Sequence, residues 1–156
     1  MKLPPAEAVA RMLGDLLGRP CSLQPTAKPG FAEQGFIGVL VDKSGITRAL
    51  TFSDKPFAAL TGAALALIPR AVAEDAVRSG TVPSSLLENH QEIINISTAL
   101  FNAVNLDAEH VKLGQILATG PAVPQAIRTF LVKPAARMDL AIDIAGYGTG
   151  KLCLLV

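Results

Sequence analysis

The sequence predicts an α/β (α+β) fold in which hairpins from the N-terminal and C-terminal parts form an antiparallel sheet that packs against long helices. Two pairs of β-prone runs surround short Gly-containing turns near residues 42–45 and 146–150. Between the hairpins, residues 55–68 and 84–104 show the apolar spacing of helices. Half of the 156 residues are apolar, but aromatic residues are few and Trp is absent, so the core must be aliphatic. This length predicts a single domain, residues 1–156.

The N-terminal part predicts a helix followed by the first hairpin. Apolar residues recur at helical spacing from Pro5 to Leu17, before Gly18, which indicates an amphipathic helix. Phe36–Val41 and Ile46–Phe52 are the arms of the hairpin. Cys21–Gln24 can add an edge strand to the same sheet.

The middle of the chain predicts three helices. Ser53-Asp54 can cap a helix that continues to Ile68 and stops at Pro69. Arg70–Thr81 predicts a short polar helix and a linker. The longest helix starts with Ser84 or Ser85 as its N-cap and runs to about Val104.

The C-terminal part predicts the closing hairpin. Val111–Ala118 and Ala126–Val132 flank a Gly120-Pro121 break, and residues 139–144 then alternate between polar and apolar side chains before a Gly-rich turn. The returning strand, Lys151–Val156, has no element after it, and an apolar edge invites aggregation. We therefore expect it to be covered by an internal strand or paired with a second copy of the chain.

Composition and spacing exclude several classes of function. The net charge is +1 and the basic residues are scattered, which argues against a nucleic-acid partner. The longest apolar stretch is too short to span a bilayer, and charged residues interrupt the N-terminal segment, so we expect a cytoplasmic protein without a membrane partner. Cys21 and Cys153 are expected to be small buried hydrophobic residues in a reducing compartment.

Two further features have the wrong spacing for a binding site. The run Gly146–Lys151 is flanked by strands, which indicates a hairpin turn and not a phosphate-binding loop. His90 and His110 have no Cys or paired carboxylates at ligand spacing, so no metal site and no bound cofactor are predicted. His90 is expected on the surface of the long helix.

The polar side of the long helix carries the candidate functional residues. Its predicted buried side holds Leu86, Ile93, Ile96 and Leu100, and the opposite side holds Glu88, Glu92, Asn95 and Asn102. Glu92 and Asn95 are three residues apart, so their side chains point the same way and can act on one partner. A solvated helix face also explains this pattern.

These features resemble the CheC/CheX family of chemotaxis phosphatases, which remove phosphate from the aspartate of CheY-like response regulators. Glu92-Ile93-Ile94-Asn95 matches the Glu-x-x-Asn helix signature of the family, with Ala99 where the family usually has Gly. The order of helices and hairpins is also similar over nearly the whole chain. With one such helix, the chain is more similar to the single-site CheX branch than to the two-site CheC pattern.

The resemblance implies an activity, residue roles and partners. Asn95 would orient the attacking water, and Glu92 would pair with a Lys of a phosphorylated CheY-like receiver domain, with Glu88 and Asn102 as further partner-binding residues. The Mg²⁺ of the reaction would belong to the receiver, and the chain would form a homodimer.

Two alternatives remain open. A non-catalytic module of the same fold would bind a receiver domain, or dimerise, without hydrolysis. It is favoured by the run Ile96–Phe101, which replaces the family's usual Met-Ile-Ser-Gly-like segment, and by the late position of Gly120-Pro121. An enzyme acting on a small metabolite has less support, because no nucleophile, base or metal cluster stands out.

Overall fold

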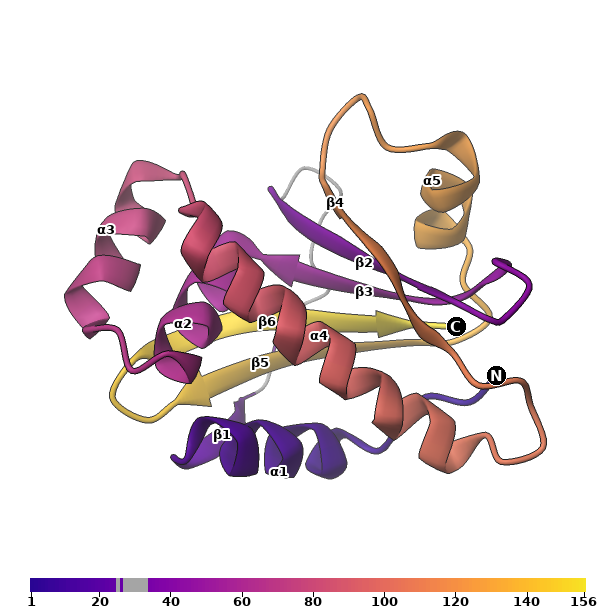
Figure 1. The fold of residues 1–156 in the computed structure, drawn as a ribbon, viewed down its shortest axis with the longest axis horizontal. Helices are drawn as coiled ribbons and strands as arrows, with labels where there is room; N and C mark the ends of the chain where they lie inside the picture. Colours follow the sequence, from indigo (N-terminus) through magenta and orange to yellow (C-terminus); the bar gives the residue numbers. More distant parts are fainter. Residues whose placement is uncertain (25, 27–33) are drawn as a thin grey trace.

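A computed structural model describes residues 1–24, 26 and 34–156, and within them the strands form one antiparallel sheet (Figure 1). The order across the sheet is β1-β5-β6-β3-β2-β4. The strands are β1 (Cys21–Gln24), β2 (Gly35–Val41), β3 (Thr47–Asp54), β4 (Lys112–Ala118), β5 (Arg137–Ile144) and β6 (Gly148–Leu155). The predicted fold class is confirmed.

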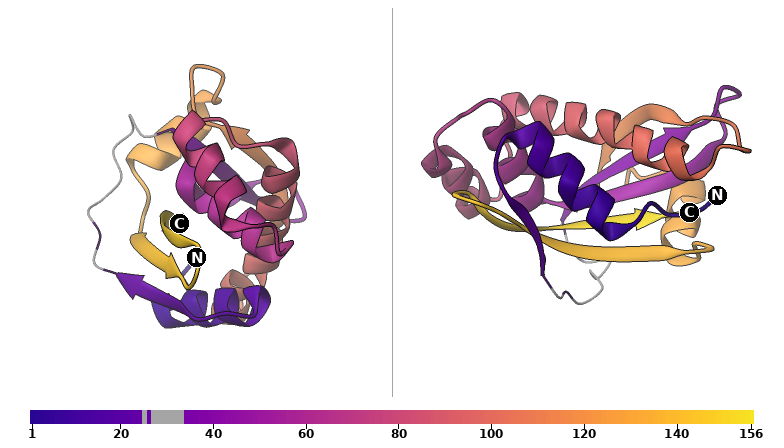
Figure 2. Two further views of the ribbon diagram at one scale, coloured as in Figure 1. Left: turned by 90° about the vertical axis from the view of Figure 1, so that its left-hand side faces the viewer. Right: turned by 90° about the horizontal axis from the view of Figure 1, so that it is seen from below.

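Helices cover the two faces of the sheet unequally (Figures 1 and 2). The larger core lies between one face and α1 (Ala6–Leu17), α2 (Lys55–Leu65) and α4 (Ser84–Val104). The other face is covered in part by α5 (Gln125–Val132), where Ile127 belongs to a second buried cluster with Leu50 and Cys153. The remaining helix, α3 (Arg70–Ser79), packs on α2.

Both predicted hairpins form, and the second lies in the middle of the sheet. β6 pairs with β5 on one side and with β3 on the other. Its apolar run therefore has no free edge, so the covering is internal and gives no reason to expect a second copy there. The edge strand predicted at Cys21–Gln24 is confirmed as β1, which among the described strands pairs only with β5.

Details at helix ends differ from the sequence-based predictions. The Asp54 cap is confirmed, since its side chain accepts a hydrogen bond from the Phe57 amide at 2.7 Å. That helix ends at Leu65 and not at Ile68, because Leu67 takes up a left-handed conformation with φ 55°. The predicted Ser N-cap of α4 was wrong, because α4 begins directly after Pro83 and Ser84 is already helical. No side chain of a described residue caps this helix. No helix in the described part of the chain is long and apolar enough to cross a membrane.

Candidate functional site

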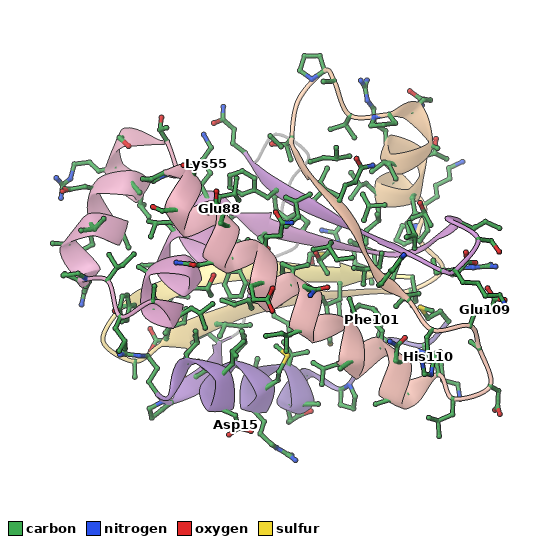
Figure 3. All side chains as sticks on the ribbon, viewed as in Figure 1. Asp15, Lys55, Glu88, Phe101, Glu109 and His110 are labelled. Atoms are coloured by element: carbon green, nitrogen blue, oxygen red, sulfur yellow. The ribbon has the colours of Figure 1, made fainter. Side chains whose placement is uncertain are left out.

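The candidate site is the outer face of α4, that is, the side of the helix that points away from the sheet. Glu88, Glu92 and Asn95 are all exposed there. Their spacing of four and three residues places them on one stripe of the helix. Figure 3 shows Glu88 in the N-terminal half of α4. The structure therefore brings these three predicted site residues together on an open surface.

The side chains of Glu88, Glu92 and Asn95 are free of partners in the described part of the chain. Among the described residues, none of them makes a hydrogen bond or an ion pair. The carboxylate oxygens of Glu88 and Glu92 and the carboxamide of Asn95 are thus available to a second molecule. A carboxylate accepts hydrogen bonds or pairs with a cation, and a carboxamide both donates and accepts.

Asn102 differs from the other predicted partner-binding residues. It is half-buried, its Nδ2 donates to the Val111 carbonyl at 3.0 Å, and its Oδ1 accepts from the Val111 amide at 2.8 Å. This pair of hydrogen bonds ties α4 to the residue that precedes β4. The structure thus gives the Asn102 carboxamide a role in holding β4 in place.

Two glycines let α4 lie close to the elements beneath it. A Cβ at Gly62 in α2 would stand 2.1 Å from the Leu86 carbonyl oxygen, and a Cβ at Gly38 in β2 would stand 2.9 Å from Ile94 Cγ2. Neither position has room for a side chain. The depth at which α4 sits, and hence the height of Glu92 and Asn95 above the sheet, depends on these glycines.

His90 was predicted on the helix surface, and the structure shows that this was wrong. Its side chain is fully buried, with Nδ1 2.9 Å from Thr61 Oγ1 and Nε2 3.1 Å from Ser53 Oγ. Phe57 packs against the ring in a T-shaped arrangement with a centroid distance of 5.7 Å. Burial lowers the pKa of His90 to about 3, so the ring is neutral near pH 7. The sequence carries a signal for this, because position 90 shares the helical face of Leu86 and Ile93.

The Thr61 hydroxyl determines which nitrogen of His90 carries the proton. Thr61 Oγ1 lies 2.6 Å from the Phe57 carbonyl oxygen, to which it must donate its hydrogen. It therefore accepts from His90 Nδ1–H, and His90 Nε2 accepts from the Ser53 hydroxyl. The hydrogen bonds run in one direction from Ser53 through His90 and Thr61 to Phe57.

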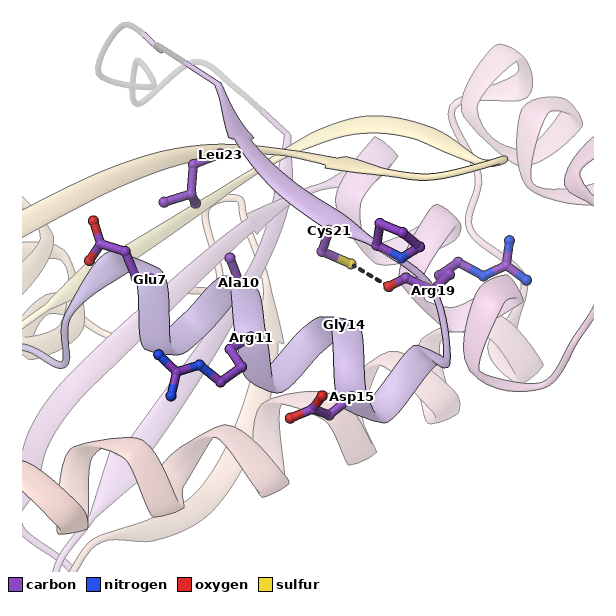
Figure 4. Close-up of a pocket in the computed structure, with 9 residues that line it drawn as sticks. Glu7, Ala10, Arg11, Gly14, Asp15, Arg19, Cys21 and Leu23 are labelled. Carbon is purple, nitrogen blue, oxygen red and sulfur yellow. Dashed lines mark hydrogen bonds between the residues drawn. The ribbon is translucent and has the colours of Figure 1, made fainter.

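A second surface feature is an open groove between α1 and β1 (Figure 4). It is lined by charged residues of α1, among them Glu7, Arg11 and Asp15, and by Cys21. Burial raises the pKa of the Cys21 thiol, which keeps it protonated and weakly reactive. Over the described residues, no group of three or more His, Cys, Asp or Glu side chains could hold a metal ion.

Comparison with known proteins gives a likeness of fold. No family model and no curated protein sequence matches the chain. The FliM middle domain from H. pylori matches with a TM-score of 0.60 at 8% identity, over 96% of this chain and 83% of that chain. Thermotoga maritima FliY matches with a TM-score of 0.55 at 11% identity, over 95% of this chain and 81% of that chain.

The CheX–CheY complex from Borrelia burgdorferi also matches, at 12% identity over 96% of this chain and 92% of that chain. The TM-score of this match is 0.49. These proteins belong to the CheC/CheX/FliM/FliY superfamily, so the predicted resemblance is confirmed at the level of fold.

Proposed function

We propose that this chain binds a phosphorylated CheY-like receiver domain through the outer face of α4 and accelerates hydrolysis of its aspartyl phosphate in the cytoplasm. The observation that carries the proposal is the pair Glu92 and Asn95, which are exposed, adjacent on one helix and without partners among the described residues. The superfamily fold supports it, because the Glu-x-x-Asn signature lies on a long helix packed against the sheet.

Asn95 would act on the attacking water. In the hydrolysis, the water oxygen forms a bond to phosphorus as the bond to the aspartate oxygen breaks, which yields inorganic phosphate and a free carboxylate. The barrier falls when one water is held in line with the breaking bond. The Asn95 carboxamide can accept one hydrogen bond from that water and donate another to an oxygen of the phosphoryl group.

The two glutamates would hold the receiver. Glu92 would pair with a Lys of the receiver's active site, a charge-assisted contact that is stronger than a neutral hydrogen bond. Glu88 lies one turn away on the same stripe and would add attraction to a basic patch. The Mg²⁺ that offsets the charge of the phosphoryl group would be held by the receiver.

The test is the rate of phosphate loss from phosphorylated receiver domains of the same organism, with and without this protein. The wild type is expected to accelerate loss from at least one receiver, and Asn95→Ala is expected to abolish the acceleration while still binding. Gln125→Ala is the matched control, because it removes an exposed amide from α5 on the other side of the sheet. Full activity in Asn95→Ala would refute the role of Asn95.

A second candidate function is a binding module without catalysis. The observation that favours it is the set of matched FliM structures, two of which were solved in complex with FliG and with SpeE. The same phosphate assay separates the two candidates. Binding of a receiver by the wild type, with no change in its dephosphorylation, would support the module and exclude the phosphatase.

We also propose that the chain forms a homodimer, as the resemblance implies. In the described part of the sheet, β1 and β4 are the edge strands, so either can pair with a second copy. Light scattering after size exclusion is expected to give twice the mass of one chain. A monomer at micromolar concentration would contradict this proposal.

A further inference from the structure

We infer that His90 is a positioning residue, which fixes the rotation of α4 about its axis and so the direction in which Glu92 and Asn95 point. The catalytic consequence rests on the proposed function, whereas the effect on the rotation of α4 does not. His90 was predicted to be exposed, and the structure instead places it at the centre of the buried face of α4.

The geometry of the helix places His90 behind the site. Each residue turns an α-helix by about 100°, so Glu92 lies about 200° from His90 and Asn95 about 140° from it. His90 therefore projects toward the core from the side of α4 opposite the midpoint of that pair. A rotation that moved the ring would turn Glu92 and Asn95 by the same angle.

Apolar packing alone holds the rotation of α4 weakly. Ile93 and Ile94 are buried on either side of the helix face, and burial of such side chains has no directional preference. Gly38 beneath Ile94 and Gly62 beneath Leu86 have no side chain that could interlock with α4. The hydrogen bonds of Asn89 with Gly62 and of Asn102 with Val111 lie to the two sides of α4, whereas those of His90 lie at the centre of its buried face.

The hydrogen bonds of His90 do not tolerate such a rotation. Both ring nitrogens are engaged, Nδ1 with Thr61 of α2 and Nε2 with Ser53 of β3. Thr61 is oriented in turn by its bond to Phe57. A rotation of about 20° moves a side-chain atom about 5 Å from the helix axis by roughly 2 Å, which breaks both bonds. The unpaired polar groups would then be buried without partners, which is costly.

The test measures the direction of α4 by the reactivity of single cysteines, in a Cys21→Ser background. Reporters are Asn95→Cys on the exposed face and Ile94→Cys on the buried face. With His90 present, position 95 is expected to react with a thiol reagent at least about tenfold faster than position 94, because position 94 reacts only through local opening. Cys153 is buried in β6 and reports global unfolding in every sample.

In His90→Leu, the labelling rate at position 95 divided by that at position 94 is expected to fall at least about threefold, while Cys153 stays protected. In His90→Gln, the amide can keep one hydrogen bond, so this ratio is expected to lie between those of His90→Leu and the wild type. An unchanged ratio in His90→Leu would overturn the inference. Should His90→Leu expose Cys153, the milder Ser53→Ala decides: a lower ratio with Cys153 protected supports the inference, and any other result overturns it.

The activity assay adds a readout that a purely structural role would not move. For a receiver that the wild type dephosphorylates, His90→Leu is expected to lower kcat at least about tenfold, with KM changed less than threefold. The reason is that a shift of about 1 Å in the attacking water lowers the rate of hydrolysis more than it lowers the affinity for the receiver. If variants whose labelling ratio is unchanged lost as much kcat as variants whose labelling ratio falls, the link between the rotation of α4 and the rate would be refuted. If the wild type accelerates no receiver, the proposed function fails, and the labelling ratio still decides the role of His90.

Discussion

Replacing Gly62 by Ala tests whether the close contact between α2 and α4 supports the position of the candidate site. The added Cβ would stand 2.1 Å from the Leu86 carbonyl oxygen and 2.8 Å from its carbonyl carbon. Both are backbone atoms, so no side chain can swing aside, and the helices must separate by about 1 Å to reach ordinary contact. The hydrogen bond from Asn89 Nδ2 to the Gly62 carbonyl, 3.0 Å long, would be strained as well.

The expected magnitude follows from two opposing effects. Overpacking a core costs up to about 3 kcal/mol. Ala is favoured over Gly inside a helix by about 1 kcal/mol. Gly62→Ala is therefore expected to lower the free energy of unfolding by about 2 kcal/mol, which lowers the Tm by roughly 4–8 °C for a chain of this size.

Gly14→Ala is the matched control, because Gly14 is also inside a helix but has room for a side chain. Its added Cβ would lie 3.4 Å from the Arg19 carbonyl oxygen and 3.9 Å from the Cys21 nitrogen, which are ordinary contacts. It is expected to raise the free energy of unfolding by about 0.5–1 kcal/mol. The same substitution thus has opposite signs at the two positions.

Urea unfolding followed by far-ultraviolet circular dichroism measures both effects, since the chain has no Trp. The midpoints should move in opposite directions at an unchanged m-value. A Gly62→Ala protein as stable as Gly14→Ala would refute the argument that close contact at Gly62 holds α4 in place.

Three other predictions follow from single residues. Leu67 is left-handed and 75% exposed, so Leu67→Gly is expected to raise the free energy of unfolding by about 1 kcal/mol, and a lower urea midpoint would contradict this. His90 has a lowered pKa, so the unfolded chain binds a proton below pH 6.5 that the folded chain does not bind until about pH 3. The free energy of unfolding should therefore fall by roughly 1.4 kcal/mol for each unit by which the pH is lowered from about 6.5 to about 3. This slope should be absent in His90→Gln and retained when the exposed His110 is changed to Gln. Glu92→Gln is expected to weaken receiver binding about fivefold and to leave the rate at saturation within about twofold, and a loss of rate without a loss of binding would refute the docking role.

Local patterns in the sequence were sufficient for the two hairpins, for the helices that precede β4 and for one face of α4, whereas β4 and α5 were given no type. The β2–β3 and β5–β6 hairpins were predicted because turn chemistry and alternation act over a few residues. The exposed stripe of Glu88, Glu92 and Asn95 was predicted because helical periodicity decides which side chains share a face.

The sequence by itself determined the two hairpins and the helices up to α4, whereas the tertiary structure decided how the elements meet. The place of β6 between β5 and β3 depends on residues about 100 positions apart, for which the sequence holds no local signal. His90 was misassigned because its partners Thr61 and Ser53 lie 29 and 37 residues away in sequence, and a polar residue is buried only where such partners satisfy it. The contact of Asn102 with Val111 was not predicted for the same reason, since it exists only after β4 has docked. Periodicity is a property of a few neighbouring residues, but burial of a polar side chain is a property of the whole fold.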